Sequence, residues 1–248
     1  MRKIVATARR IPYWQLNALI FTLFVPLSGQ AELHPTVLLQ VPEVRQHTVY
    51  SCGAAALQAI LAYYSIDVRQ DVLIQKLGTN ENEGTKYWEI VRVAREYGLT
   101  AETILQMTRH QIIGEINRGI PVFIAIQAWI QSGDPRNITD WKIRKDDGHY
   151  LIAIGYDDER MYFEDPAMFG IGYIEFDELE ARWHDYDQNG NRLDHFAIIV
   201  SDPKESARKR PIYSPINGNM VVVYKVYVES IVVARDAPGD ARRPSQPQ

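Results

Sequence analysis

The sequence contains a single cysteine, Cys52, among 248 residues. A chain with one thiol cannot form an internal disulfide, so in an oxidising compartment Cys52 would be either a free thiol or a link to another molecule. The phosphate-binding pattern GxxxxGK[ST] is absent, and beyond residue 31 no apolar run reaches the length of about 20 residues that a membrane helix needs. We therefore expect neither a P-loop ATPase domain nor a stable membrane span in the mature chain.

Positive charge is not in excess: 27 Lys and Arg residues are outnumbered by 31 Asp and Glu residues. The formal net charge is −4, and residues 1–31 hold four basic side chains and no acidic ones, so cleavage after residue 31 would leave a net charge of −8. Nucleic acids and anionic lipids attract cationic surfaces, so neither is an expected partner. Hydrophobic residues make up 46% of the chain, which is enough to bury one good core.

Residues 1–31 have the layout of a secretory signal peptide. A basic segment ends at Arg10, a mostly apolar stretch runs from Leu16 to Leu27, and small residues precede an expected cleavage at Glu32. The alternative is an uncleaved signal anchor. Either form predicts an exported protein, periplasmic or secreted.

The rest of the chain divides near residue 202. Residues 32–202 are predicted to form the main domain, and residues 203–248 a C-terminal extension. The extension includes a possible β segment over 219–234 and a tail rich in Pro, Arg, Asp and Ser, which predicts disorder.

Apolar periodicity predicts an α+β fold, with helices first and an antiparallel sheet after them. The predicted helices cover 53–64, 69–77, 86–97, 109–117 and 177–182. The predicted strands cover 37–39, 103–107, 120–126, 149–156, 161–165, 173–176 and 195–200. Between them lies a long polar connection, 127–148; its residues Trp129 and Trp141, together with the loop 79–84, are candidate walls of a substrate cleft.

Cys52 lies where a polar run becomes an Ala-rich helix. The unpaired N–H groups and the positive end of the helix dipole favour a thiolate at this position, so Cys52 is placed like a nucleophile. The small residues 53–56 would let another segment approach the first turn closely. The alternative is a buried, inert cysteine.

A cysteine nucleophile needs a base and a group that orients the base. Among six histidines, His149 is the strongest candidate because Gly148 precedes it and a buried strand follows it. Asp165 can reach His149 only if both side chains share a face, which requires an odd-length loop or a β-bulge between their strands; a two-residue turn at 158–159 alone would fail. The alternative for Asp165 is a simple Asp-Pro turn.

The other histidines are assigned by their position. His34, His47, His110 and His184 are expected to be solvated, and His195 to lie in the core. Gln46, six residues before Cys52, could direct its amide toward the same carbonyl oxygen as the Cys52 N–H, forming an oxyanion hole. Alternatively, it is a loop residue that points to water.

Several short segments now combine into a pattern: Gln46, Cys52-Gly53, Gly119-Ile120-Pro121-Val122, Gly148-His149-Tyr150 and Asp165-Pro166. From about residue 41 to 202 this pattern resembles cysteine peptidase family 39, the bacteriocin-processing double-glycine peptidases. The resemblance implies a papain-like cysteine peptidase fold without a cofactor. It assigns the nucleophile to Cys52, the oxyanion-hole amide to Gln46, the general base to His149 and the orienting carboxylate to Asp165.

The best-known members of that family are fused to membrane transporters with an ATP-hydrolysing domain, and this chain contains neither part. We therefore expect an exported cysteine peptidase that acts on a peptide or protein substrate through a thioester. The family's cytoplasmic leader peptides are not the expected substrate. A papain-like acyltransferase or transpeptidase, and a non-catalytic peptide-binding module, are the alternatives.

A further motif, Asp185 to Asn191, resembles the first half of an EF-hand calcium loop. Its twelfth position is Phe196 instead of the bidentate Glu. A turn between a helix and a strand explains the motif as well, and no metal is expected.

Overall fold

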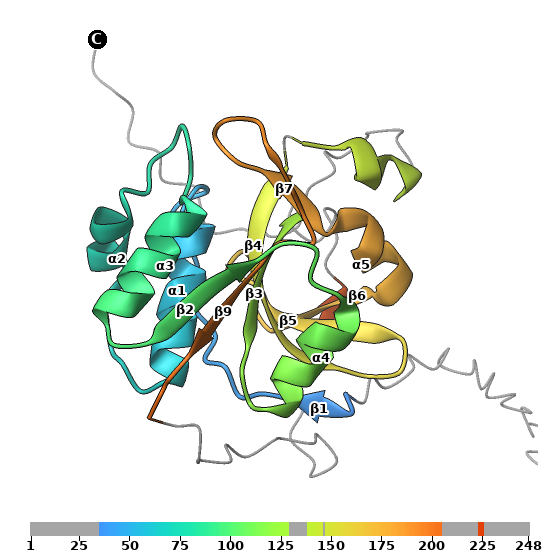
Figure 1. Ribbon diagram of the computed structural model, residues 1–248, viewed down its shortest axis with the longest axis horizontal. Helices are drawn as coiled ribbons and strands as arrows, with labels where there is room; N and C mark the ends of the chain where they lie inside the picture. Colours follow the sequence, from blue (N-terminus) through green and yellow to red (C-terminus); the bar gives the residue numbers. More distant parts are fainter. Residues whose placement is uncertain (1–34, 129–137, 146, 205–222, 226–248) are drawn as a thin grey trace, which may run out of the picture. The chain divides into compact units, whose positions relative to one another are not determined.

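The computed structural model describes residues 35–128, 138–145, 147–204 and 223–225. The expected signal peptide, Trp129 and most of the C-terminal extension lie outside these residues. The described residues form helices around a mainly antiparallel sheet, as the α+β prediction required (Figure 1).

The helices lie close to their predicted positions. They are α1 (Cys52–Tyr63), α2 (Gln70–Leu77), α3 (Tyr87–Glu96), α4 (Arg109–Asn117) and α5 (Phe176–Arg182), with a 3-10 helix over Ile138–Ile143. Gly78 ends α2 in the left-handed conformation, and Thr108 caps α4 by accepting the Gln111 N–H. The start of α5 was predicted wrongly: its N-cap is Glu175, because the extended backbone of β6 runs directly into the helix.

Within the described part of the chain, the main sheet has eight strands. Seven of them follow the order β10-β6-β5-β4-β3-β9-β2, and β1 pairs with β4. Their bounds are β1 (Val37–Leu38), β2 (Thr100–Ile104), β3 (Val122–Gln127), β4 (Gly148–Tyr156), β5 (Arg160–Glu164), β6 (Ile171–Glu175), β9 (Ala197–Ser201) and β10 (Val223–Lys225). The pairing is antiparallel except between β6 and β10. Strand β10 falls inside the β segment expected over 219–234.

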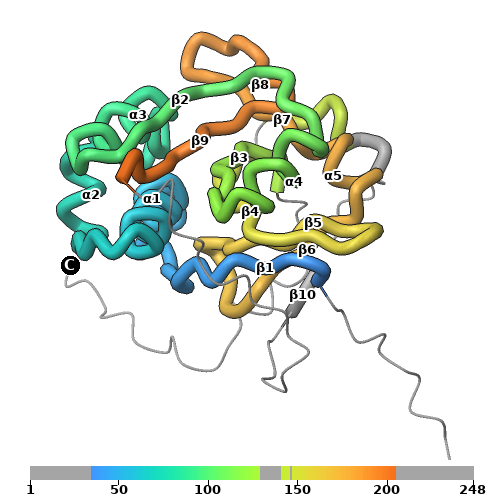
Figure 2. The backbone as a smooth tube through the Cα atoms, turned by 60° about the horizontal axis from the view of Figure 1, so that its bottom comes forward, coloured from blue at the N-terminus to red at the C-terminus, as the bar shows by residue number. Residues whose placement is uncertain are grey.

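Strands β3 and β4 form the buried centre. Every residue of β3 is buried, and so are seven of the nine residues of β4, as the all-apolar run had predicted. The alanines of α1 are mostly fully buried, so this helix packs close to the sheet. In Figures 1 and 2, α1, α2 and α3 lie together, apart from α4 and α5. No helix among the described residues is both long and apolar enough to span a membrane.

Strand β2 lies three residues earlier than predicted. Thr100 pairs with Ser201 and Ile104 with Ala197, after which the chain leaves the sheet. Gln106 has φ of 54°, and its N–H donates to the Asp194 carbonyl. Residues 105 and 106 therefore form an exposed bend, after which the Met107 side chain is buried, where a strand had been expected.

A two-stranded hairpin, β7 (His184–Tyr186) and β8 (Arg192–Asp194), was not predicted at all. Its strands have three residues each, which is too short for a recognisable alternating pattern. The prediction that His184 is solvated is wrong, because only 1% of the residue is exposed and its Nε2 lies 3.0 Å from the Arg144 carbonyl oxygen. Burial lowers the pKa of His184.

Candidate active site

Cys52 is the first residue of α1 and is half-buried. Its position at the helix N-terminus depends on a close contact one residue later. A Cβ added to Gly53 would lie 2.6 Å from the Thr85 Cβ, so only glycine fits there without displacing the neighbour. Thr85 is itself held by a 2.8 Å hydrogen bond to Thr79. The expected close approach to the first turn is therefore made by the segment that leads into α3.

His149 and Asp165 are in direct contact. The His149 Nε2 lies 2.8 Å from Asp165 Oδ1, and the two residues are 2% and 0% exposed. Asp165 Oδ1 also accepts the Ala167 N–H at 2.8 Å, which fixes the carboxylate. The Cys52 side chain hydrogen-bonds the same imidazole, and because Nε2 faces Asp165, the nitrogen toward the thiol is Nδ1. The structure thus brings these three predicted residues together.

The turn between β4 and β5 would by itself prevent this contact. The Asp157 N–H donates to the Arg160 carbonyl at 3.0 Å, which leaves a two-residue turn at 158–159. With regular pairing on both strands, that turn places His149 and Asp165 on opposite faces of the sheet.

A β-bulge in β4 restores the common face. Gly155 pairs with Tyr162, but Ala153 pairs with Phe163, so Ile154 has no partner in β5. One extra residue reverses the face of every residue that precedes it in β4. The bulge was one of the two conditions that the sequence had required for the histidine–aspartate contact.

Strand β1 holds the bulge in place. The Leu39 N–H donates to the Ile154 carbonyl at 2.7 Å, so the extra residue keeps a backbone partner. A side chain at Gly155 would collide with the Val37 carbonyl and lie 2.8 Å from the Leu38 Cδ1. Glycine is therefore the residue that lets β1 lie against the bulged strand.

The charge on His149 depends on its two neighbours. Burial disfavours the imidazolium, but the charges of Asp165 and Cys52 and their hydrogen bonds outweigh it and raise the pKa of His149 to about 10. The imidazolium is then the dominant form at neutral pH. Such an arrangement can hold a thiolate beside a proton donor.

Gln46 lies in the loop that leads to Cys52. Its backbone N–H donates to the Pro166 carbonyl at 2.9 Å, which ties this loop to the residue after Asp165. Its side-chain Nε2 donates to the Thr48 carbonyl at 2.8 Å, and its buried Oε1 has no partner. Among the described residues no hydrogen bond joins the Gln46 side chain to Cys52 or His149. Since the amide has two hydrogens, one remains for another acceptor.

The residue that fixes this loop was not found from the sequence. Gln70, the first residue of α2, is buried; its Oε1 accepts the His47 N–H at 2.7 Å and its Nε2 donates to the Arg45 carbonyl at 2.8 Å. Nε2 also donates to Gln58 Oε1 of α1 at 3.1 Å. Gln70 therefore holds the backbone on both sides of Gln46. A glutamine at a helix start is typical of a solvated position, so no sequence signal distinguished it.

The remaining candidates lie apart from this group. His47 and His110 are exposed, as predicted, and His34 lies outside the described residues. His195 was expected in the core but is partly exposed, and it stacks on Trp183 with ring centroids 4.8 Å apart. Trp141 is only 1% exposed and lies under the Arg182 guanidinium, so it is a core residue and not part of a cleft wall.

The calcium-like motif forms the turn of the β7–β8 hairpin. Asp187 accepts the N–H groups of Asn189 and Asn191 at 2.9 and 2.8 Å, while Asp185 hydrogen-bonds Gln127 in β3. The two carboxylates thus have separate partners, as the turn interpretation implied. Within the described ranges no group of three or more His, Cys, Asp and Glu side chains could hold a metal ion.

The chain is similar to several known proteins. An uncharacterized protein of Methanothermobacter marburgensis is 26% identical over 125 residues, 50% of this chain and 71% of that protein. A double glycine motif protease from an AMS/PCAT transporter, solved with its leader peptide, is 20% identical with a TM-score of 0.46, covering 68% of this chain and 99% of that one. A Bacillus anthracis structure described as a C39-like peptidase is 19% identical with a TM-score of 0.49, covering 70% and 98%.

The sequence profile of one family spans most of the described domain. The profile of the Peptidase_C39 like family matches residues 38–191, a range that includes Gln46, Cys52, His149 and Asp165. The predicted α+β class, with helices around a mainly antiparallel sheet, is confirmed. The chain belongs to the Peptidase_C39 like family.

Proposed function

We propose that the protein is a cysteine peptidase that hydrolyses peptide bonds with Cys52, His149 and Asp165. One observation carries the proposal: a buried imidazole contacts the Asp165 carboxylate at 2.8 Å and the Cys52 thiol through its other nitrogen. Family membership supports the same reaction class.

In the first step the Cys52 thiolate attacks the carbonyl carbon of the substrate, and the carbonyl π electrons move onto oxygen. Attack removes the negative charge of the thiolate, which is one cause of the raised pKa of His149. The imidazolium thus becomes a stronger acid when the leaving amine needs a proton. Collapse of the intermediate breaks the C–N bond and leaves a thioester on Cys52.

In the second step neutral His149 takes a proton from water, and the resulting hydroxide attacks the thioester. The C–S bond breaks, the acid product leaves, and the thiolate–imidazolium pair is restored. Asp165 keeps a proton on Nε2 throughout, so Nδ1 is the nitrogen that exchanges protons.

Gln46 would stabilise the oxyanion together with the Cys52 N–H, which belongs to the unpaired first turn of α1. The free hydrogen of its Nε2 is the donor for this role. The hydrogen bonds of Gln70 to the backbone of Arg45 and His47 hold the loop that carries Gln46 in place.

The test is the rate of iodoacetamide alkylation of Cys52 between pH 5 and 9. The wild type is expected to react rapidly well below the free-thiol pKa of about 8.5, and His149→Ala is expected to lose this low-pH reactivity. His110→Ala replaces an exposed histidine and serves as control. If the wild type reacts only as a free thiol does, or not at all when folded, the peptidase proposal is wrong.

Product analysis then separates the alternatives. Hydrolysis of peptides from a library yields free acids, whereas an acyltransferase yields an amide when an amine nucleophile is added. A peptide-binding module would bind library members and cleave none.

Export is a second part of the proposal, and it rests on residues 1–31 alone. Cell fractionation of the full chain and of a chain without these residues tests it. The full chain is expected outside the cytoplasm with a mature N-terminus at Glu32, and the shortened chain inside. A full chain retained in the cytoplasm would contradict export without affecting the proposed chemistry.

A further inference from the structure

A second carboxylate lies beside the proposed active site. Asp185, in β7, packs directly on Gly148, the residue before His149. A Cβ added to Gly148 would lie 2.6 Å from Asp185 Oδ1 and 2.7 Å from Oδ2, so the whole carboxylate group faces this backbone. The absence of a side chain at residue 148 is what leaves room for it.

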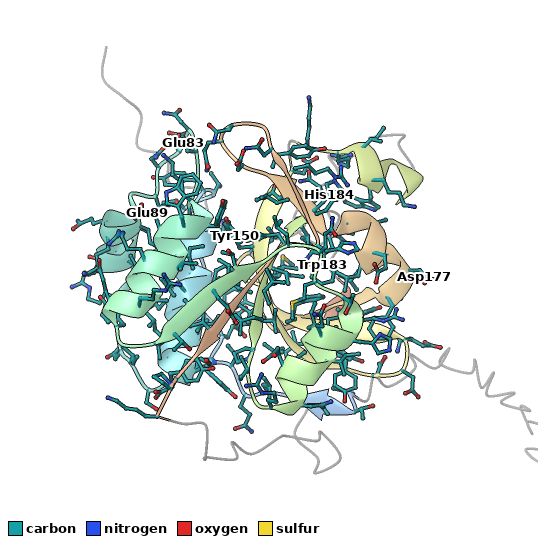
Figure 3. All side chains as sticks on the ribbon, viewed as in Figure 1. Glu83, Glu89, Tyr150, Asp177, Trp183 and His184 are labelled. Atoms are coloured by element: carbon teal, nitrogen blue, oxygen red, sulfur yellow. The ribbon has the colours of Figure 1, made fainter. Side chains whose placement is uncertain are left out.

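The carboxylate is close enough to act on the reacting groups. Its charge interacts with His149. Burial raises the pKa of the neighbouring Tyr150 phenol, and the charges of Asp185 and Cys52 raise it further. The Tyr150 hydroxyl donates to the Thr85 carbonyl at 3.2 Å, in the segment that packs on the start of α1. Figure 3 labels Tyr150 near the centre of the view, with His184, the neighbour of Asp185 in β7, above it and to its right.

Asp185 has amide partners and, among the described residues, no ion pair with a Lys or Arg; the nearby His149 acts on it only through its charge. Gln127 Nε2 donates to its Oδ1 at 3.1 Å, and the Tyr186 N–H donates a further hydrogen bond to the carboxylate. Two other acids are ion-paired: the half-buried Asp157 with Arg160, and the buried Glu178 with Arg182. A poorly solvated carboxylate without a cation is costly to the folded state.

Glu164 provides a contrast, because it is buried and likewise forms no ion pair with a Lys or Arg among the described residues. It accepts the Val44 N–H at 2.7 Å, and burial raises its pKa to about 8, so it carries a proton at neutral pH. Burial raises the pKa of Asp185 only to about 6. Asp185 is partly exposed and lies against Gly148, next to His149, whereas Glu164 is buried, so Asp185 is the one of these two acids that a ligand can reach.

We propose that Asp185 selects a positively charged nitrogen on the substrate next to the bond that is cleaved. This inference rests on the proposed peptidase function and names its substrate class as peptides with a cationic group at the site. The nitrogen can belong to a Lys or Arg side chain or to a free α-amine. Both would form a charge-assisted hydrogen bond with the Asp185 carboxylate.

The first experiment needs no peptidase activity. Cys52 is modified with a cationic methanethiosulfonate, the 2-(trimethylammonium)ethyl reagent, and with neutral methyl methanethiosulfonate, and the ratio of the two rates is measured at pH 7.5 and low salt. We expect the wild type to favour the cationic reagent by about tenfold or more, and Asp185→Asn to lose most of this preference. The control is Asp194→Asn, an exposed acid of the same hairpin, which is expected to keep it.

The second experiment compares kcat/KM for peptides that carry Lys or its uncharged isostere norleucine at each position, with free and with acetylated N-termini. The wild type is expected to prefer Lys at one position, or a free N-terminus, by about tenfold or more, and Asp185→Asn is expected to abolish that ratio. Loss of the preference on acetylation identifies the α-amine as the source; its persistence identifies the side chain.

The outcomes separate the two proposals. A wild-type protein without cationic preference toward either reagents or peptides, or an Asp185→Asn variant that retains it, overturns the role of Asp185. A protein that favours the cationic reagent through Asp185 but cleaves no peptide retains the cation site and loses the proposed peptidase function.

Discussion

Replacing Asp185 with asparagine is expected to make the protein more stable at neutral pH. Burial raises the pKa of Asp185 from 3.8 to about 6, although the Tyr186 N–H, Gln127 and His149 all favour the charged form. The folded protein therefore binds this proton more tightly than the unfolded chain. The free energy of unfolding falls as the pH rises from about 3.8 to about 6 and then stays at the lower value.

The size of the gain follows from that difference. A shift of about two pKa units, at 1.36 kcal/mol each, corresponds to about 3 kcal/mol above pH 6. Asparagine has the same shape, and its Oδ1 can still accept the Gln127 amide, so no cavity forms. Asp185→Asn should therefore raise the free energy of unfolding by up to about 3 kcal/mol at pH 7.5 and by close to zero at pH 3.5.

Urea unfolding of the wild type, Asp185→Asn and Asp194→Asn at both pH values measures this effect. Asp194 is exposed and bound to Arg192, so its replacement should change stability by less than about 0.5 kcal/mol. A gain of equal size at pH 3.5 and 7.5 would mean that the charge of Asp185 is not its cause. A loss of stability at pH 7.5 would refute the view that this carboxylate lacks a compensating partner.

Three other predictions concern the elements that position the site. Gly53→Ala should lower stability by about 1–3 kcal/mol because its Cβ would lie 2.6 Å from that of Thr85; thermal unfolding measures this, and Gly114→Ala, with nothing within 4 Å, is the control that should not lose stability. Deleting Ile154 should remove the bulge and lower kcat/KM at least about 100-fold with the fold retained by circular dichroism, because the histidine loses its carboxylate; near-normal activity would contradict the assigned register. Gln70→Leu should lower kcat about 10- to 100-fold by releasing the loop that it holds, and an unchanged kcat would show that the loop needs no such support.

The strongly patterned elements were predictable from the sequence. The all-apolar run of β3 and the Ala-rich α1 lie within two residues of their expected positions because their burial leaves few alternatives. Strand β2 was misplaced because Met107 is as buried after the bend as it would be in a strand. The three-residue strands of the β7–β8 hairpin carry no period that could be recognised.

The candidate site was predictable to the extent that its chemistry is local. A lone cysteine at a helix start and a histidine after Gly148 are recognisable in the chain itself. The sequence also shows that His149 and Asp165 can share a face of the sheet only if the β4–β5 connection has an odd-length loop or a bulge. The sequence could name a bulge as one solution but could not locate it at Ile154, because the bulge depends on β1, more than a hundred residues away. Gln70 and Asp185 were missed as site residues for the same reason, since their roles arise only from tertiary contacts.

The two aspartates near His149 differ in how their charge is compensated. Asp165 is fully buried, and its Oδ1 contacts the imidazole and accepts the Ala167 N–H, so its charge already has a partner inside the protein. Asp185 has amide hydrogen-bond partners, interacts with His149 only through its charge, and stays partly exposed. A carboxylate that orients a base must stay hydrogen-bonded to it, whereas a carboxylate that recognises a ligand must be accessible to that ligand. The same side chain at two depths can thus serve the proposed chemistry in one case and substrate choice in the other.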